Sequence, residues 1–415
     1  MFSKTVLDNG IRILSEQRSN TRSVTLGIWV ENGSRHEAVE QSGISHFIEH
    51  LFFKGTEQRS ATRIAEEIDS VGGVLNAFTG KEATCYYAKV LDENLPLAMD
   101  LLSDIYLHSI FDTEEIDRER SVVLQEICQV EDAPDDYVHE LFNLDLFGDH
   151  PLGRPICGGA ATVSSFQRQE FLDFVRRRYL PGRVLVVGAG NLRHEDLVAR
   201  ASKDFAPLKA SPLSADGPSP KFRSGVFQHT KPLEQVHLCL GVVGIQQNHR
   251  KRYAAYLLNT LLGGGMSSRL FQEIREKRGR AYSIYSFLSS YRDVGYLAIY
   301  AGTSMEWVKE VVELIIREMG RLTAGKIKAE ELERTKSQLV GNTLLGLESS
   351  NSWMSHIARS EIYFGKAISP EEIAADVHSV TKNDIIELAS EILRPEGIAL
   401  TLLGDFEKTP LDLRI

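Results

Sequence analysis

The sequence is notable first for what it lacks: long apolar runs and paired cysteines. No stretch of its 415 residues approaches the length of uninterrupted apolar sequence that a membrane-spanning helix needs. The first residues, MFSKTVLDNGIRILSEQ, contain no apolar run of signal-peptide length. The four cysteines are scattered and include no CxxC pair, which is typical of reduced thiols. We therefore expect a cytoplasmic protein without a membrane partner.

An excess of positive charge is also missing. The formal net charge is −10, whereas binding to nucleic acid requires clustered Lys and Arg, so we expect no nucleic-acid partner. The apolar share of 42% is ordinary for a globular protein, and 415 residues are too many for one ordinary core. The composition therefore predicts two or more domains.

The order of predicted elements occurs twice along the chain. A strand, two helices, a strand pair and a helix follow one another at 23–34, 42–53, 60–71, 74–91 and 93–109. The same order returns at 236–245, 251–265, 267–279, 281–303 and 304–322. This repetition predicts a duplicated unit of the α+β class, in which each mostly antiparallel sheet carries helices on one face. We expect domains at 1–205 and 222–415, joined by a linker at 206–221 that is rich in Pro, Ser and Ala.

A short motif, HFIEH, lies within the first predicted helix of the repeat. His46 and His50 are one turn apart and share a helix face, and Glu49 falls on the same side. Two neutral imidazoles at this spacing can reach one zinc ion, and a neighbouring carboxylate can take a proton from the attacking water. HxxEH is the reverse of the HExxH zinc motif. The alternative is a solvated helix face whose histidines are merely polar.

A third metal ligand should come from another helix. The segment DRERSVVLQEICQVED offers Glu119 and Glu126, which are seven residues apart and therefore lie on one face. The alternative is that both belong to the charged surface of a helix that is already rich in Glu and Arg.

With these spacings the sequence resembles the M16 peptidases, the group of pitrilysin and the mitochondrial processing peptidase. The segments GISHFIEHLFFKGT, VLNAFTGKEATCYYAKV, ERSVVLQEI and HPLGRPICG stand in the family's order, and the resemblance covers essentially the whole chain. It implies the M16 (LuxS-like) metallopeptidase fold. The length matches the short-subunit, M16B-type branch, which pairs two chains, and this short form suggests a bacterial protein.

The resemblance also implies roles for the residues of the motif. His46, His50 and Glu126 would bind one Zn²⁺ per chain, and Glu49 would be the general base. Glu119 would orient a ligand histidine from outside the ligand set.

A substrate strand is implied at Asn76, Ala77 and Phe78, before the turn at Gly80. In the family this strand is a sheet edge near the zinc, to which an extended peptide adds through backbone hydrogen bonds. The alternative is a plain hairpin strand.

In the second half, Arg275 and Tyr282 match an Arg and a Tyr that reach the zinc cleft from the second domain in the family. The tyrosine could donate to the developing oxyanion, and the arginine could hold substrate carbonyls. A basic helix face is the alternative, because Arg269, Arg278 and Arg280 lie nearby. Since one chain carries both sets of residues, we expect a homodimer with two complete sites, although one partner could be inert.

The expected function is that of a zinc metalloendopeptidase that cleaves short unfolded or presequence-like peptides inside a closed chamber. The alternative is a non-catalytic core subunit or an activator subunit, in an M16 heterodimer or a respiratory-type assembly. Retention of His46, Glu49, His50 and Glu126 argues against that alternative.

Overall fold

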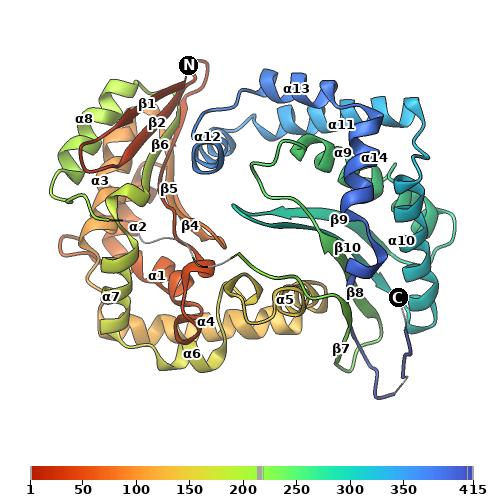
Figure 1. The fold of residues 1–415 in the computed structure, drawn as a ribbon. Coiled ribbons are helices and arrows are strands. Elements are labelled where there is room, and N and C mark those ends of the chain that lie inside the picture. Colours follow the sequence, from red (N-terminus) through yellow and green to blue (C-terminus); the bar gives the residue numbers. More distant parts are fainter. Residues whose placement is uncertain (1, 213–216, 218, 409, 414–415) are drawn as a thin grey trace. The chain divides into compact units, whose positions relative to one another are not determined.

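The computed structural model describes residues 2–212, 217, 219–408 and 410–413, and it consists of two compact units. The first unit comprises Met1–Gln129, Arg154–Pro218 and Gly346–Ile368, and the second comprises Val130–Gly153, Ser219–Leu345 and Ser369–Ile415. The two units therefore exchange segments, and neither is the contiguous range that the sequence suggests (Figure 1). Within the expected linker, residues 213–216 and 218 lie outside the described part.

The first unit contains a six-stranded sheet in the order β1-β2-β6-β3-β5-β4. All neighbours are antiparallel except β2 and β6, which are parallel. β1 and β2 form a hairpin around Asn9-Gly10, and Gly10 adopts the left-handed conformation there (φ 92°). The strands are β1 (Phe2–Val6), β2 (Arg12–Gln17), β3 (Ser23–Val30), β4 (Val74–Thr79), β5 (Thr84–Leu91) and β6 (Val184–Gly190).

Helices of the first unit cover one face of this sheet and form its main core with it. Ser60 caps α2 by accepting a hydrogen bond from the backbone N–H of Arg63. The helices are α1 (Ile44–Phe52), α2 (Ala61–Ser70), α3 (Leu95–His108), α4 (Thr113–Asp132), α6 (Ala160–Ser165), α7 (Arg168–Arg178) and α8 (His194–Phe205).

The opposite face of the sheet is covered by a helix from far along the chain, α12 (Ser350–Phe364). This helix packs on β2, β3 and β6, and its Met354 lies over Trp29. The expectation of helices on one face is therefore incomplete. Because α12 covers the second face of the sheet, β3 is buried at every position after Ser23.

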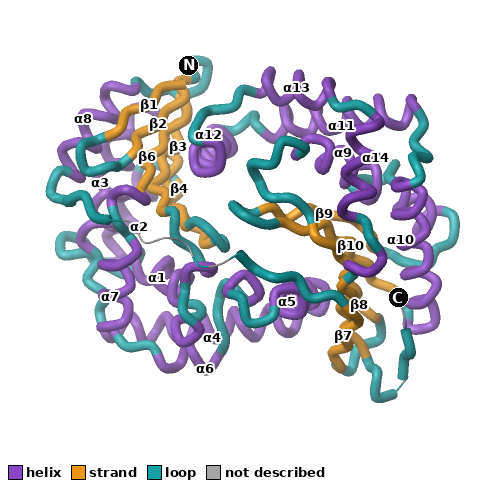
Figure 2. The backbone as a smooth tube through the Cα atoms, viewed as in Figure 1, coloured by secondary structure: helices purple, strands orange, loops and turns teal. Residues whose placement is uncertain are grey.

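The second unit is built on a five-stranded sheet in the order β7-β11-β8-β10-β9, with β7 and β11 parallel and the other neighbours antiparallel. Its strands are β7 (Gly225–Thr230), β8 (Val236–Val243), β9 (Ser283–Ser290), β10 (Gly295–Thr303) and β11 (Ala399–Gly404). One face carries helices from the C-terminal half (Figure 2). The helices of that half are α9 (Arg252–Gly263), α10 (Val308–Thr323), α11 (Ala329–Gly346), α13 (Pro370–Ser379) and α14 (Lys382–Ile392). The helix expected at 267–279 is wound as a π-helix over Phe271–Glu276.

The other face of this second sheet carries α5 (Pro134–Phe147), a helix from the N-terminal half of the chain. The two sheets thus repeat one design: β2-β6-β3-β5-β4 corresponds to β7-β11-β8-β10-β9, and each sheet receives one helix from the other half. The α+β class and the two-domain architecture are confirmed. Among the described residues, no helix is long and apolar enough to cross a membrane.

A glycine in the corresponding central strand makes room for each of these two helices. A Cβ on Gly27 of β3 would lie 2.8 Å from Sδ of Met354, and one on Gly241 of β8 would lie 2.4 Å from Cζ of Phe142. Both separations are shorter than van der Waals contact, so a side chain at either position would push the helix away from its sheet.

Candidate metal centre

Helix α1 begins under close constraint. Gly43 at its start has φ 96°, and a Cβ there would lie 2.6 Å from the carbonyl oxygen of Cys157, so only glycine fits. The buried carboxylate of Glu37, only 3% exposed, accepts hydrogen bonds from the backbone N–H groups of Gly43 and Ser45 at 2.8 Å each. A carboxylate at this position accepts hydrogen bonds from N–H groups that have no partner within the helix. Its negative charge also interacts favourably with the positive end of the helix dipole.

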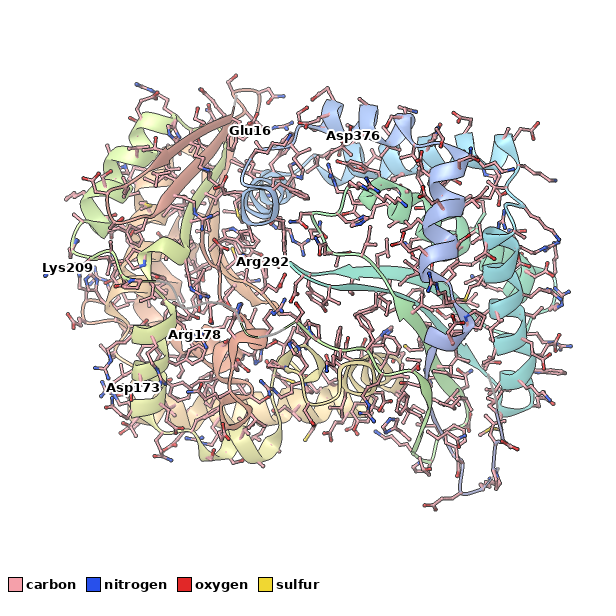
Figure 3. The ribbon with its side chains drawn as sticks, viewed as in Figure 1. Glu16, Asp173, Arg178, Lys209, Arg292 and Asp376 are labelled. Atoms are coloured by element: carbon pink, nitrogen blue, oxygen red, sulfur yellow. The ribbon has the colours of Figure 1, made fainter. Side chains whose placement is uncertain are left out.

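Neighbouring contacts hold the segment before α1 in place. The guanidinium of Arg178 on α7, labelled in Figure 3, donates a hydrogen bond to the carbonyl of His36 at 2.8 Å. Arg154 donates to the carbonyl of Glu37 at 2.5 Å. The start of α1 is therefore fixed by side chains that are distant in the sequence.

The packing of α1 turns its polar residues toward α4. Phe47, Leu51 and their apolar neighbours on α1 belong to the main core. On the other side, Oε2 of Glu126 lies 3.6 Å from Nε2 of His46 and 3.5 Å from Nε2 of His50. The two imidazole rings are 4.8 Å apart and are steeply inclined to each other. The structure thus brings together the three residues that the sequence singled out.

These three side chains suit a zinc ion. Ligands at the usual Zn–N and Zn–O lengths of a tetrahedral site lie about 3.4 Å apart, close to the separations from Glu126. One potential ligand atom from each of His46, His50 and Glu126 lies within 4.8 Å of the other two. Two imidazoles and one carboxylate are a donor set typical of catalytic zinc, which leaves a fourth position open.

Burial keeps His46 able to act as a ligand, and a hydrogen bond orients His50. The pKa of His46 is lowered to about 4, first by burial and second by the charge of His50, so its imidazole is neutral at neutral pH. The Nδ1 of His50 is hydrogen-bonded to Oε2 of Glu119 at 3.0 Å, which leaves its Nε2 directed toward Glu126.

The carboxylate that orients His50 is itself held by a lysine. Glu119 on α4 is only 6% exposed, and its second oxygen lies 2.7 Å from Nζ of Lys54, just beyond the end of α1. The lysine balances the charge of a carboxylate that is buried beside the metal-binding residues.

Glu49 lies on the same side of α1 and is not one of the three residues that could bind the metal together. Its pKa is raised, chiefly by burial; the charge of Glu126 adds to the rise, while Thr79 and His50 oppose it. The hydroxyl of Thr79, at the end of β4, donates to Oε2 of Glu49 at 2.5 Å. A half-buried carboxylate in a fixed orientation, with a raised pKa, has the properties of a general base.

The predicted substrate strand is β4, which forms one edge of the first sheet and packs beside α1. Asn76 is exposed, and its Oδ1 accepts the N–H of Ala77 at 2.8 Å. The ring of Phe78 is 40% exposed and lies edge-on to Trp29. The position of β4 at the sheet edge agrees with the expectation, while its use by a substrate stays a prediction.

Arg275 and Tyr282 lie together in the second unit. The guanidinium of Arg275, in the π-helical segment, is 5.2 Å from the ring centre of Tyr282, which is 81% exposed. The competing arginines serve local structure, because Arg269, Arg278 and Arg280 form ion pairs with glutamates. Among the described residues, Arg275 forms no ion pair. Its action, with Tyr282, on the metal-binding residues of the first unit stays a prediction.

Three residues around the site were missed by sequence reasoning: Glu37, Lys54 and Thr79. Lys54 follows the HFIEH helix and Thr79 follows Phe78 of the predicted substrate strand. Their closeness to these segments could have marked them as candidates. Glu37 had no local signal, because it caps α1 from outside the helix and not from the position directly before it.

Two repeated α+β units, with two histidines and a glutamate gathered in one of them, are the arrangement of a metallopeptidase. The family model described as Insulinase (Peptidase family M16) matches residues 12–160, and the one described as Peptidase M16 inactive domain matches residues 165–339. The chain belongs to the M16 peptidase family.

Relatives agree with this assignment, and a solved structure shares the fold. The uncharacterized zinc protease YmxG of Bacillus subtilis is 42% identical over 99% of this chain and 100% of its own length. An uncharacterized zinc protease of Streptomyces coelicolor is 41% identical over 97% of this chain and 89% of its own. The fold is shared with a protease from Helicobacter pylori, at a TM-score of 0.89 and 23% identity, covering 97% of this chain and 99% of that one.

Proposed function

We propose that the chain is a zinc-dependent metalloendopeptidase that cleaves short unfolded or presequence-like peptides. The observation that carries this proposal is the convergence of His46, His50 and Glu126, with Glu49 beside them on α1. The printed names of its relatives, which call them zinc proteases, support zinc as the metal.

Each residue near the site has a distinct task. His46, His50 and Glu126 hold the ion, and Glu119 with Lys54 keeps the imidazole of His50 in one orientation. Zinc, when bound, supplies a Lewis acid that polarises the scissile carbonyl and makes water more acidic. Glu49 takes the proton of the attacking water and returns it to the departing amine. Burial raises the pKa of Glu49, which makes its carboxylate a stronger proton acceptor.

The edge strand β4 offers a way to bind peptides with little regard to their sequence. An extended substrate would add to this edge by backbone hydrogen bonds, which a folded protein cannot offer. Thr79, at the end of the same strand, contacts Glu49, so a peptide along β4 would run toward the general base.

The second unit is proposed to complete the site with Arg275 and Tyr282. The hydroxyl of Tyr282 would donate to the oxyanion, and Arg275 would hold substrate carbonyls. Because one chain carries both sets of residues, we propose a homodimer with two active sites, each enclosed in a chamber. The bacterial relatives agree with a bacterial origin, and a cytoplasmic location stays a prediction.

The test is cleavage of a quenched fluorescent peptide by the purified chain. A chelator should abolish cleavage, and added zinc should restore it. The alternative, a non-catalytic core or activator subunit, requires that the chain alone does not cleave peptides even when zinc is bound. Loss of cleavage in Glu49→Gln with unchanged zinc content would separate the enzyme from a contaminating peptidase.

A further inference from the structure

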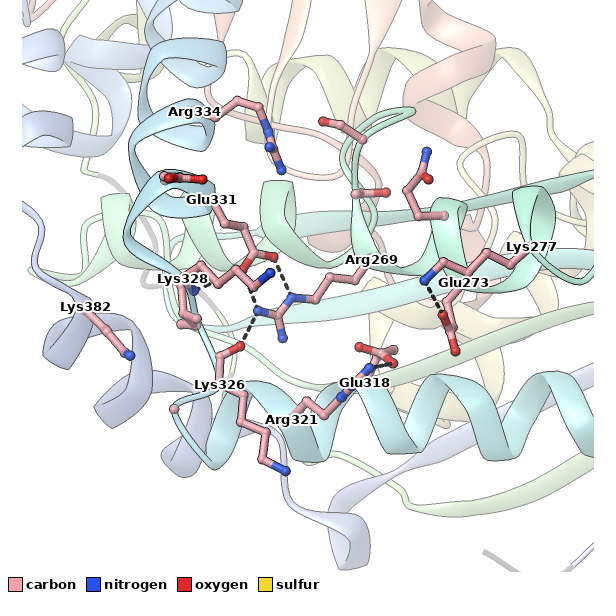
Figure 4. A pocket seen from close by; sticks show the side chains of 16 residues that line it. Arg269, Glu273, Lys277, Glu318, Arg321, Lys326, Lys328, Glu331, Arg334 and Lys382 are labelled. Carbon is pink, nitrogen blue, oxygen red and sulfur yellow. Dashed lines mark hydrogen bonds and ion pairs between the residues drawn. The ribbon is translucent and has the colours of Figure 1, made fainter.

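The second unit contains an open pocket of about 750 Å³ that the proposed peptidase chemistry does not use. Its walls come from the helical segment at 267–277, the end of α10, the loop from α10 to α11, the first turns of α11 and the start of α14 (Figure 4). This volume falls in the range of small-molecule sites.

The lining of the pocket has an excess of positive charge. Three of its four carboxylates are paired with cations of the same pocket: Glu331 with Arg269, Glu273 with Lys277 and Glu318 with Arg321. Four more cations line it, namely Lys326, Lys328, Arg334 and Lys382. Among the described residues, the side chains of these four form no ion pair or hydrogen bond. Only Glu330 opposes them as a carboxylate without a partner in the described part.

The loop that carries two of these cations is held in place. Arg269 binds both oxygens of Glu331 at 2.8 Å and donates to the carbonyl of Lys326 at 2.6 Å (Figure 4). Glu331 also accepts the N–H of Lys328 at 3.3 Å. The turn between the two helices is made by Gly325, with φ 68°. The Arg269–Glu331 pair therefore positions Lys326 and Lys328 at the pocket before any ligand arrives.

The lining also excludes most other ligand classes. Ile327 is its only large apolar residue, and it has no aromatic side chain on which a base or a sugar ring could stack. Lysines bind phosphate groups as point charges, and the planar guanidinium of an arginine such as Arg334 can bind two phosphate oxygens at once. We propose that this pocket binds a linear polyphosphate, with Lys326, Lys328, Arg334 and Lys382 as its counter-charges.

The pocket shares a helical segment with Arg275. Arg269, Glu273 and Lys277 are spaced four residues apart and face the pocket, while Arg275 contacts Tyr282. A bound polyphosphate would therefore reduce opening of the backbone at 267–277 as well as in the loop at 324–328.

The proposal can be tested by calorimetric titration of the full chain with inorganic tripolyphosphate. We expect Lys328→Glu with Arg334→Glu to weaken binding, by about tenfold for each reversed charge. Lys309→Glu is the matched control, because Lys309 is an exposed lysine of α10 outside the pocket. Tripolyphosphate also chelates zinc. This contribution to the measured heat is the same for the wild type, the double variant and Lys309→Glu, so it cancels when their affinities are compared.

Hydrogen exchange provides a second measurement. Tripolyphosphate should protect the amides of 267–277 and 324–328 in the wild type and in the Lys309→Glu variant, and not in the double variant. Equal affinity in the double variant and the control would overturn the proposal. Equally tight binding of orthophosphate or of an acidic peptide would also overturn it, because the pocket would then not be specific for a phosphate chain.

Discussion

The sheets of the two units correspond in strand order, but the helix beside the edge strand has a different sequence in each unit. α1 packs beside the edge strand β4, and α9 packs in the same way beside β9. α1 carries the sequence ISHFIEHLF, while α9 carries RYAAYLLNTLLG, which contains no His, Asp or Glu. The order of strands and the sheet packing therefore survive in a unit that cannot build the metal site on its corresponding helix. The chemistry depends on a few side chains placed on a common scaffold.

A second difference lies at the start of these two helices. At α1 the carboxylate of Glu37 accepts two backbone N–H groups, those of Gly43 and Ser45. At α9 the imidazole of His249 accepts one, the N–H of Lys251 at 3.1 Å. The helix that carries the metal-binding residues is therefore held at its start by a buried carboxylate, and the corresponding helix by a single contact to a histidine.

The largest expected effect comes from removing the group that takes the proton. Glu49→Gln should lower peptidase activity about 1000-fold, because the amide cannot accept a proton from water. Zinc content should not change, because Glu49 is outside the proposed ligand set. Glu57→Gln, an exposed glutamate just after α1, serves as control and should keep full activity. Substantial activity in the Glu49 variant would contradict the proposed role.

The second effect tests the carboxylate that caps α1. Burial raises the pKa of Glu37 from 4.5 to about 7, so between these values the folded protein holds a proton that the unfolded chain has lost. Stability from this group is therefore complete below about pH 4.5 and is lost as pH rises through about 7, by up to about 3 kcal/mol. Glu37→Gln should lack this decline. Denaturant unfolding of the metal-free proteins between these pH values measures the difference, and parallel profiles would refute it.

The third effect tests how alike the two exchanged helices are. Gly241→Ala should destabilise the protein by about 2–3 kcal/mol, because its Cβ would meet the rigid ring of Phe142. Gly27→Ala should cost only about 1 kcal/mol, because the thioether of Met354 can move aside. Thermal unfolding of both variants gives the comparison. A larger loss of stability in Gly27→Ala than in Gly241→Ala would show that the sheet, and not the helix side chain opposite the glycine, determines the loss.

The smallest effect concerns the orientation of His50. Glu119→Gln should weaken zinc binding about tenfold, at the lower end of the usual range, because the amide keeps one acceptor oxygen for the imidazole. Competition with a zinc-binding dye measures this directly, without recourse to activity. An unchanged affinity would mean that packing alone orients the ring.

The site was more predictable from sequence than the fold around it. His46, Glu49 and His50 share a helix face by periodicity, and the seven-residue spacing of Glu119 and Glu126 places both on one side of α4, where the structure has them. Such regularities are local, so they can be seen in a single sequence. The role of Glu37 could not be inferred, since it depends on a contact between separate segments.

The same limit applies to the sheets. β3 is buried at every position after Ser23 because α12 lies over its second face. Nothing within residues 23–34 indicates that a helix from 350–364 will cover them. The π-helical turn at Phe271–Glu276 is likewise invisible in a pattern that fits an α-helix equally well.

The exchange of α5 and α12 has a consequence for the order in which the protein can be made. A chain that leaves the ribosome completes the strands of the first sheet at Gly190, but the helix that covers their second face begins only at Ser350. Until then, Trp29, Leu185 and Val187 remain without their cover. The first unit cannot be completed before α12 has been made, and the sheet of the second unit also needs β11 at Ala399–Gly404. Neither unit can therefore reach its final state before segments from both halves of the chain have been synthesised.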